Sequence, residues 1–158
     1  MEKRKEFLDT LSAFFLTKGF KKKGNTMSLD TASSVSIVNF QKSSYGDMYY
    51  LNFGVFFKDK NQEVKTETLK IEDAHFFTRY DKLLGTKTES IEIPEIEDIS
   101  GFTQEIILNI DKKIMPYPED LTSVTYLKTI LPKNIPWDKI WLQNIKGDDL
   151  LKLVESNL

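Results

Sequence analysis

Two runs of strand-forming residues decide the fold of this chain, Val35-Ser-Ile-Val-Asn-Phe-Gln-Lys42 and Tyr49-Tyr-Leu-Asn-Phe-Gly-Val-Phe-Phe57. β-branched and aromatic residues fill both runs, and such residues suit the pleated, half-buried surface of a sheet. The connecting segment contains Gly46 and Asp47, which favour turns. The stretch therefore predicts an antiparallel hairpin, with Val35–Lys42 paired to Tyr49–Phe57.

Amide side chains interrupt the apolar pattern of this hairpin at Asn39, Gln41 and Asn52. A buried amide without a hydrogen-bond partner costs about 1–3 kcal/mol, so these groups must find partners. Two interpretations are open: the amides bond to one another and to the turn backbone, or they bind a ligand. The first is favoured, because most buried polar side chains are satisfied within the fold.

The N-terminal segment has the pattern of an amphipathic helix over Glu2–Lys18. Its apolar side chains recur at helical spacing, at Phe7, Leu8, Leu11, Phe14 and Phe15. Gly19 follows directly and suits the left-handed position after a helix end. We expect this apolar stripe to pack against the sheet.

Further strands are predicted at Thr26–Asp30, Glu63–Ile71 and His75–Tyr80, the last two as a pair. Three helices are predicted after residue 100, covering 102–114, 118–130 and a terminal segment that begins at Asp148. Ser100 is the expected N-cap of the first. Trp137 and Trp141 are four residues apart and are expected on one helix face.

This order of elements indicates an α+β fold. It predicts an antiparallel sheet of about four to five strands, with the N-terminal helix and the C-terminal helices packed on one face. The other face of the sheet is then partly open, and it carries amides and tyrosines.

Length and composition fit one domain that spans residues 1–158. The chain is 40% hydrophobic and 29% charged, as is ordinary for a globular protein. No apolar run approaches the roughly 20 residues of a membrane-spanning helix, and the first residues do not have the pattern of a secretory signal. We therefore expect a cytoplasmic protein with no membrane partner, and the lack of cysteine agrees with that compartment.

The formal net charge of −2 and the isoelectric point near 5.5 argue against a nucleic-acid partner. Basic residues nevertheless gather near the start, where residues 1–25 hold seven Lys or Arg and three Asp or Glu. The favoured interpretation is a solvated helix face and loop.

Chemical motifs are few. The sequence has no phosphate-binding glycine loop, and one histidine without cysteine does not make an ordinary zinc site, so no cofactor or metal is expected. Asp73, His75 and Arg79 are the one cluster with acid–base potential, because their even spacing would place them on one face of an extended strand. The favoured alternative is structural, with His75 hydrogen-bonded in the sheet and Arg79 paired to a carboxylate.

Three blocks of the chain resemble a bacterial family catalogued as a domain of unknown function, number forty-three-oh-four. The blocks are Gly19-Phe-Lys-Lys-Lys-Gly-Asn-Thr26, Asn39-Phe-Gln-Lys-Ser43 and Asn52-Phe-Gly-Val55, within the first half of the chain. The segment Asp73–Arg79 is similar to a Cys-His-x-x-x-Arg segment of that family, with Ala74 in place of the cysteine. The resemblance implies a shared fold and lends no activity.

Three function classes follow from these observations. The first is a protein-binding module, such as an immunity or inhibitor protein, whose binding residues are Gln41, Tyr45, Tyr50, Asn52, His75 and Arg79. The second is an enzyme acting on a small molecule through Asp73, His75 and Arg79. The third is a nucleic-acid-binding accessory protein that uses the N-terminal lysines and stacking tyrosines. Single-domain size, no catalytic motif and an open polar–aromatic face favour the first.

Overall fold

The computed structural model describes residues 2–46, 48–59, 63–79, 91–93, 96–114, 141–142, 145 and 147–156. Its elements in chain order are α1 (Glu2–Thr17), β1 (Lys21–Lys23), β2 (Thr26–Asp30), β3 (Ser34–Lys42), β4 (Met48–Phe57), the 3₁₀ turns η1 (Thr66–Thr68) and η2 (Ile71–Asp73), β5 (Phe76–Arg79), β6 (Ile91–Glu92), α3 (Ile99–Asn109), a π-helical segment (Ile110–Ile114), β7 (Trp141–Leu142) and α6 (Gly147–Glu155).

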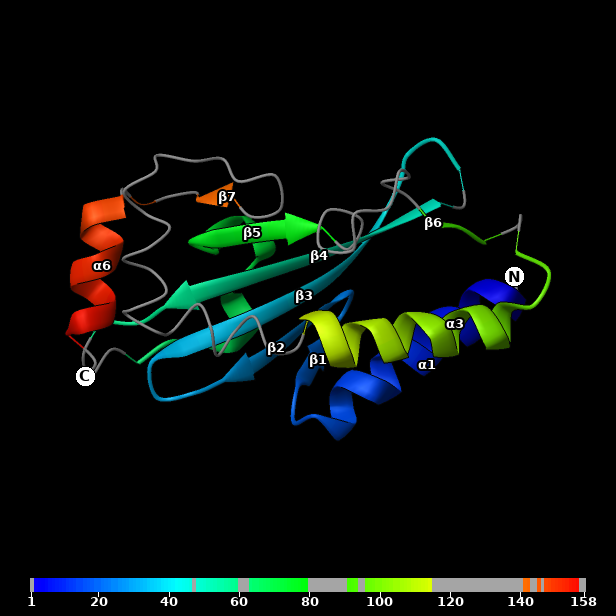
Figure 1. Ribbon diagram of the computed structural model, residues 1–158, viewed down its shortest axis with the longest axis horizontal. Helices are drawn as coiled ribbons and strands as arrows, with labels where there is room; N and C mark the ends of the chain where they lie inside the picture. The colour runs from blue at the N-terminus through cyan, green and yellow to red at the C-terminus, as the bar shows by residue number, and fades with distance from the viewer. Residues whose placement is uncertain are drawn as a thin grey trace.

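One antiparallel sheet organises the described residues, with the strand order β1-β2-β3-β4-β5-β7 and with β6 paired to β4 (Figure 1). The predicted hairpin is confirmed: β3 and β4 pair along their length, with Asn39 opposite Asn52. Five strands have three or more residues, while β6 and β7 have two each. The fold class is α+β, as the sequence predicts.

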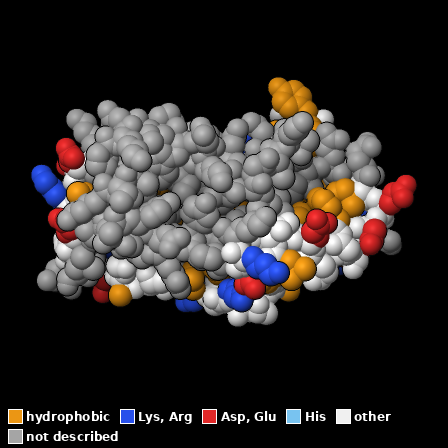
Figure 2. Space-filling model, viewed as in Figure 1, with side chains coloured by type: hydrophobic (Ala, Val, Ile, Leu, Met, Phe, Trp, Pro, Cys, Tyr) orange, Lys and Arg blue, Asp and Glu red, His pale blue; other side chains and the backbone are white. Residues whose placement is uncertain are grey.

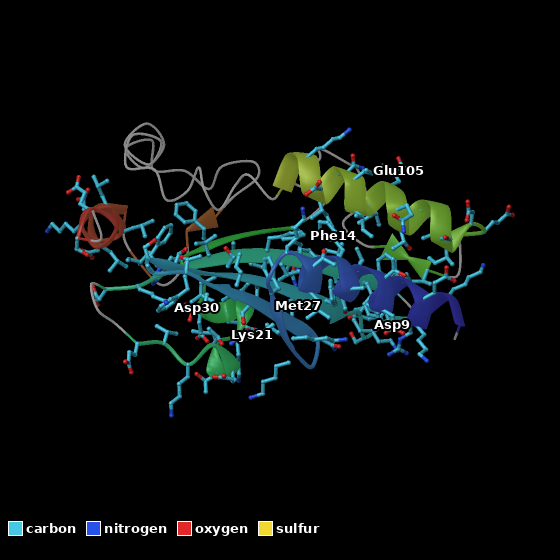
Figure 3. All side chains as sticks on the ribbon, turned by 90° about the horizontal axis from the view of Figure 1, so that it is seen from below. Asp9, Phe14, Lys21, Met27, Asp30 and Glu105 are labelled. Atoms are coloured by element: carbon cyan, nitrogen blue, oxygen red, sulfur yellow. The ribbon has the colours of Figure 1, made fainter. Side chains whose placement is uncertain are left out.

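Helices α1 and α3 lie side by side on one face of the sheet (Figures 1 and 3). The α1 stripe supplies Phe7, Leu11 and Phe15, which are fully buried, and Leu8 and Phe14 pack at the edge of the same core. Strand residues whose side chains face these helices complete the core, including Met27, Val38, Phe40, Leu51, Phe53 and Val55. Helix α6 adds Leu150 to this core at the other end of the sheet.

The end of α1 has the hydrogen bonds of a Schellman motif. The N–H of Phe20 donates to the carbonyl of Phe15, and the N–H of Gly19 donates to the carbonyl of Leu16. Gly19 has a φ of +92°, a conformation that side chains with a Cβ avoid. The rings of Phe15 and Phe20 meet edge to face at 5.2 Å, so the turn also buries apolar surface.

The segment that contains η1 and η2 packs on the opposite face of the sheet (Figure 3). Ile71 and Ala74 of this segment pack on Val35 and Ile37 of β3 in a second small core. Gly54 permits the close approach, because a Cβ there would lie 2.6 Å from the Cβ of Ala74. The predicted strand Glu63–Ile71 is therefore wrong. Its apolar residues cover the sheet instead of joining it.

Two further predictions are corrected in the C-terminal half. Asp98, not Ser100, is the N-cap of α3, since its carboxylate accepts a hydrogen bond from the N–H of Gly101 at 3.0 Å. Trp141 lies in β7, paired with β5, and not in a helix. The predicted helix over 118–130 and Trp137 lie outside the described residues.

Acidic and basic side chains are interspersed on the surface of the described residues in Figure 2. Lys18 and Asp111, for example, form an ion pair at 3.1 Å between the end of α1 and the π-helical segment. The described residues that are visible in Figure 2 therefore form no large area of one charge. Within the described residues, no helix has the length and apolar character to cross a membrane.

Candidate functional site

Beside the part of the sheet that Ile71 and Ala74 cover, the face opposite α1 and α3 carries a row of polar residues that are directly opposite one another on four strands. Thr26 of β2 is paired with Asn39 of β3, Asn39 with Asn52 of β4, and Asn52 with Arg79 of β5. Residues in register on neighbouring strands point to the same face of a sheet. These four residues are called the cross-strand polar row.

Hydrogen bonds connect the row from one strand to the next. Arg79 Nε donates to Asn52 Oδ1 at 3.2 Å, Asn52 Nδ2 donates to Asn39 Oδ1 at 3.4 Å, and Asn39 Nδ2 donates to Thr26 Oγ1 at 3.1 Å. Each asparagine accepts from one side and donates to the other. The side chain of Asn52, which is 1% exposed, is thereby satisfied in the middle of the sheet.

Gln41 and Tyr50 form the next pair of opposed residues on this face, beside the pair of Asn39 and Asn52. They are opposite each other in the hairpin, and Gln41 Oε1 accepts a second hydrogen bond from Asn52 Nδ2 at 3.0 Å. The guanidinium carbon of Arg79 lies 4.7 Å from the centre of the Tyr50 ring, a cation–π distance. Arg79 is thus held by the Tyr50 ring and by the Asn52 side chain.

Four of the six predicted binding residues therefore lie together: Gln41, Tyr50, Asn52 and Arg79. Tyr45 is in the turn that joins β3 and β4, where its side chain is 90% exposed. Together these five residues are called the polar–aromatic patch. The amides bond mainly to one another and to neighbouring strands, which agrees with the favoured interpretation from the sequence.

His75 lies elsewhere, before β5 and under α6. Its ring stacks on Phe56 and Phe57, with centroids 4.7 Å and 6.2 Å away, and it is 8% exposed. A cavity of about 450 Å³ adjoins it, lined also by Asp59 and by Asp149 and Lys152 of α6. His75 is therefore not part of the polar–aromatic patch.

The hydrogen bond of His75 determines what its ring can do. Nδ1 accepts from the backbone N–H of Phe57 at 2.9 Å, so the neutral ring carries its proton on Nε2. Burial lowers the pKa of His75 below its usual value, and the negative charge of Asp59 opposes that shift. The ring is thus a neutral donor whose acceptor nitrogen is occupied, an unfavourable arrangement for a general base.

The predicted cluster of Asp73, His75 and Arg79 is not assembled. Asp73 lies in η2 and not in an extended strand, and its carboxylate accepts a hydrogen bond from the N–H of Lys70 at 2.8 Å. Arg79 contacts Asn52 and Tyr50, whereas His75 contacts Phe56 and Phe57. Even spacing places residues on a shared face only when all of them lie in one extended strand, and Asp73 lies in η2 instead.

Lys58 is a buried charge that sequence reasoning did not identify. It follows β4, is 7% exposed, and its Nζ contacts Asp30 Oδ1 and donates to the carbonyl of Thr31 at 2.6 Å. These contacts hold the β2–β3 turn against the end of β4. A lysine after an apolar strand resembles a surface residue in sequence, so no signal distinguished it.

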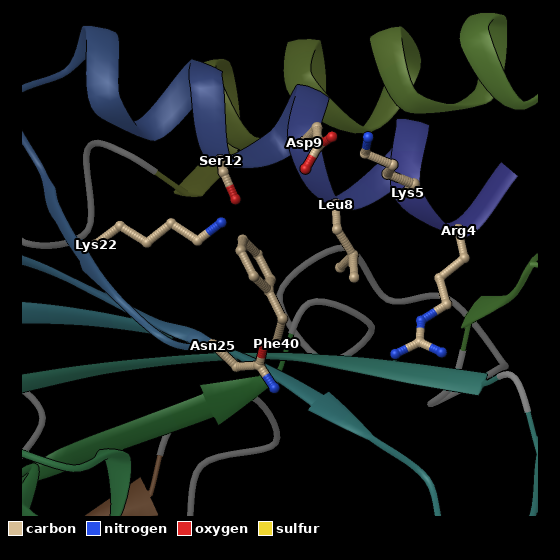
Figure 4. Close-up of a pocket in the computed structure, with 8 residues that line it drawn as sticks. All are labelled: Arg4, Lys5, Leu8, Asp9, Ser12, Lys22, Asn25 and Phe40. Atoms are coloured by element: carbon tan, nitrogen blue, oxygen red, sulfur yellow. The ribbon is translucent and has the colours of Figure 1, made fainter. Parts of the chain in front are cut away.

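A second cavity, of about 520 Å³, lies between α1 and the sheet (Figure 4). Sequence reasoning also missed it as a site. Its lining residues come from α1, from β1 and the turn after it, and from β3: Arg4, Lys5, Leu8, Asp9, Ser12, Lys22, Asn25 and Phe40. The only sequence signal is Ser12, a hydroxyl next to the apolar Leu11 on the stripe of α1. It is called the α1 cavity.

Comparison with known protein families gives one match. The model of a family described as a domain of unknown function, DUF4304, matches residues 11–120, which is more than half of the 158 residues. The match includes β1–β5 and α3, and so contains the polar–aromatic patch. Neither the curated proteins nor the solved structures gave a match.

Proposed function

Because the chain belongs to the DUF4304 family of domains of unknown function, we propose a function from its geometry: it is a cytoplasmic protein-binding module, such as an immunity or inhibitor protein. The polar–aromatic patch is the proposed contact surface. The observation that carries the proposal is the fixed position of Arg79, between the Tyr50 ring and the Asn52 side chain.

Fixed arginine and tyrosine side chains are suited to protein contacts. Trp, Tyr and Arg are the residue types that dominate the energy of protein interfaces. An arginine that is already held loses less rotamer freedom on binding, and each flexible side chain immobilised costs about 0.5–1.5 kcal/mol. The contacts of Arg79 in the free protein therefore favour its use as an anchor.

Tyr45 adds an exposed aromatic side chain at the tip of the same hairpin. It is the most exposed large hydrophobic side chain of the described residues, at the tip of the hairpin whose strands carry Gln41, Tyr50 and Asn52. A partner that covers the hairpin end would bury the Tyr45 ring and could bond to the Gln41 amide. We therefore expect Tyr45, Tyr50 and Arg79 to supply most of the binding energy.

The arrangement at His75 gives less support to an enzyme. A general base needs a free nitrogen lone pair, and Nδ1 of His75 already accepts the Phe57 N–H. Reproducible turnover of a small substrate that is lost in His75→Gln would contradict the proposal.

A pull-down from native lysate tests the proposed surface. Tagged protein is compared with Tyr45→Ala and with Leu108→Ala, a matched control on α3 whose side chain is also exposed, at 57%. We expect a protein that the starting chain and Leu108→Ala capture and that Tyr45→Ala does not. Thermal melts of each variant exclude unfolding as the cause.

Two results would contradict the proposal. One is a partner that Tyr45→Ala, Tyr50→Ala and Arg79→Ala all retain in full. The other is recovery of RNA in place of protein, with the loss of binding when Lys21, Lys22 and Lys23 are neutralised; that result would support the nucleic-acid class instead.

A further inference from the structure

We propose that the α1 cavity binds a small organic anion that combines an anionic group with a flat apolar body. This site is separate from the polar–aromatic patch, because Lys22 and Phe40 of its lining point to the helix-covered face of the sheet. Lys22 is paired with Met27, and Phe40 with Leu51, and both Met27 and Leu51 belong to the core under α1.

The lining has an excess of positive charge. Arg4, Lys5 and Lys22 are basic, and Asp9 is the one acidic residue among the described residues that line the cavity. Among the described residues none of these four side chains forms an ion pair, whereas Lys18 and Lys58 do. Cations that no carboxylate neutralises raise the local concentration of anions.

Ser12 provides a second and independent observation. The residue is 4% exposed, lines the cavity, and its Oγ has no hydrogen-bond partner in the structure. A serine in a helix can bond to the carbonyl four residues earlier, but this hydroxyl does not. Buried hydroxyls are nearly always satisfied, so a group in the cavity is the natural partner of Ser12.

The remaining lining residues define the rest of the ligand. Leu8 and Phe40 give the cavity apolar walls, and Asn25 and Asp9 add groups that can bond to polar atoms of a ligand. Figure 4 shows Lys22 and Ser12 directed into the space beside the Phe40 ring. An anionic group near Lys22 and a flat body along Phe40 would use these features together.

Size favours a small molecule over a polymer. The volume of about 520 Å³ lies in the range of roughly 300–1,000 Å³ that is usual for small-molecule sites. Asp9 within the lining would repel a second nearby phosphate of a nucleic acid. A single anionic group is the better match.

Titration with 1-naphthyl phosphate, followed by backbone amide NMR, tests the proposal. We expect saturable shifts at Ser12, Lys22, Asn25 and Phe40, with a dissociation constant below about 1 mM for a ligand of this size. The matched controls are 1-naphthol, which lacks the anion, and inorganic phosphate, which lacks the flat body. Each should bind at least about tenfold more weakly, because each satisfies only part of the site.

Adjacent lysines of β1 give a matched pair of variants. Lys22→Gln removes a lining charge and should weaken binding by about tenfold or more, while Lys21→Gln removes the same charge from the other face of the strand. The control should stay within about twofold of the starting chain. Equal losses in both variants would indicate attraction to the whole basic segment and overturn the site.

Ser12→Ala separates a ligand contact from a structural role. Removing an unpartnered buried hydroxyl should leave the melting temperature unchanged or raise it. The same substitution should weaken the binding of 1-naphthyl phosphate by about threefold or more. The proposal is overturned if the probe shows no saturation up to about 10 mM, if the shifts map away from the α1 cavity, or if Ser12→Ala binds as tightly as the starting chain.

Discussion

Asn52 and Arg79 are directly opposite each other on β4 and β5, and Arg79 Nε donates to Asn52 Oδ1 at 3.2 Å. In sequence, β4 and β5 are separated by the segment that contains η1 and η2. This segment packs on the sheet face opposite α1 and α3. This contact joins β4, the second strand of the hairpin, to β5. It also fixes the arginine on which the proposed binding surface depends.

Loss of the Asn52 side chain should destabilise the fold. Asn52→Ala removes one partner from Arg79, Asn39 and Gln41 at once. Leaving buried polar groups unpaired costs about 1–3 kcal/mol, so the free energy of unfolding in urea should fall by that amount. Gln41→Ala, at an exposed position of the same cluster, should change it by less than about 0.5 kcal/mol. Equal losses of unfolding free energy in the two variants would show that burial of the Asn52 hydrogen bonds does not account for their effect on stability.

The buried stripe of α1 predicts a large and local effect. Phe15→Ala should lower the free energy of unfolding by about 3–5 kcal/mol, because the ring is fully buried against Phe20, Phe40 and Phe53. Leu16→Ala, on the exposed side of the same helix, should stay within about 0.5 kcal/mol. Denaturant melts of the two variants give the comparison, and a loss below about 1 kcal/mol for Phe15→Ala would contradict the packing.

The close approach at Gly54 predicts coupling between two variants. Gly54→Ala should cost about 1–3 kcal/mol, because its Cβ would meet the Cβ of Ala74 at 2.6 Å. Ala74→Gly in the same chain should restore part of that loss. A double-mutant cycle measured by urea unfolding should therefore give a coupling of about 0.5 kcal/mol or more. If the effects of the two substitutions on the free energy of unfolding are strictly additive, the contact between the η2 segment and β4 is contradicted.

Burial of His75 predicts a dependence of stability on pH. The pKa is lowered in the folded chain, so the unfolded chain binds the proton more tightly. The contribution of His75 to stability is fully present above about pH 6.5, the unfolded pKa, and is lost as the pH falls toward the folded pKa. Its slope cannot exceed about 1.4 kcal/mol per pH unit, the value for one proton.

His75→Asn isolates this contribution. Asparagine does not titrate, and its Oδ1 can still accept a hydrogen bond from the N–H of Phe57. Unfolding free energies measured from pH 8 to pH 5 should show the starting chain losing stability relative to the variant below about pH 6.5. Parallel curves for the two proteins would mean that His75 titrates normally in the fold.

The sequence predicted elements whose signals are local. Helical spacing of apolar residues located α1, and the dense β-forming runs located the β3–β4 hairpin. Predictions failed where a local pattern has several tertiary outcomes: the apolar residues of 63–71 cover a sheet face, and both Asp98 and Ser100 are acceptable N-caps. For residues 63–71, the contacts of Ile71 and Ala74 with Val35 and Ile37 join segments that are distant in sequence.

The same distinction between local patterns and contacts of distant segments applies to the candidate sites. Gln41, Tyr50 and Asn52 could be grouped from the sequence because the hairpin alone places them together. The addition of Arg79 depends on how β5 pairs with β4, and the α1 cavity depends on how a helix lies over β1 and β3. Neither relationship has a local signature in the chain.

The most direct test of the proposed function is the affinity of the purified partner for patch variants. By isothermal titration calorimetry, Tyr45→Ala and Tyr50→Ala should each weaken binding by about 2 kcal/mol or more, roughly 30-fold, as interface anchors do. Leu108→Ala should weaken it by less than about threefold. We expect both tyrosine variants to bind more weakly than Leu108→Ala; unchanged affinity in both, with their melting temperatures intact, would contradict the proposed contact surface.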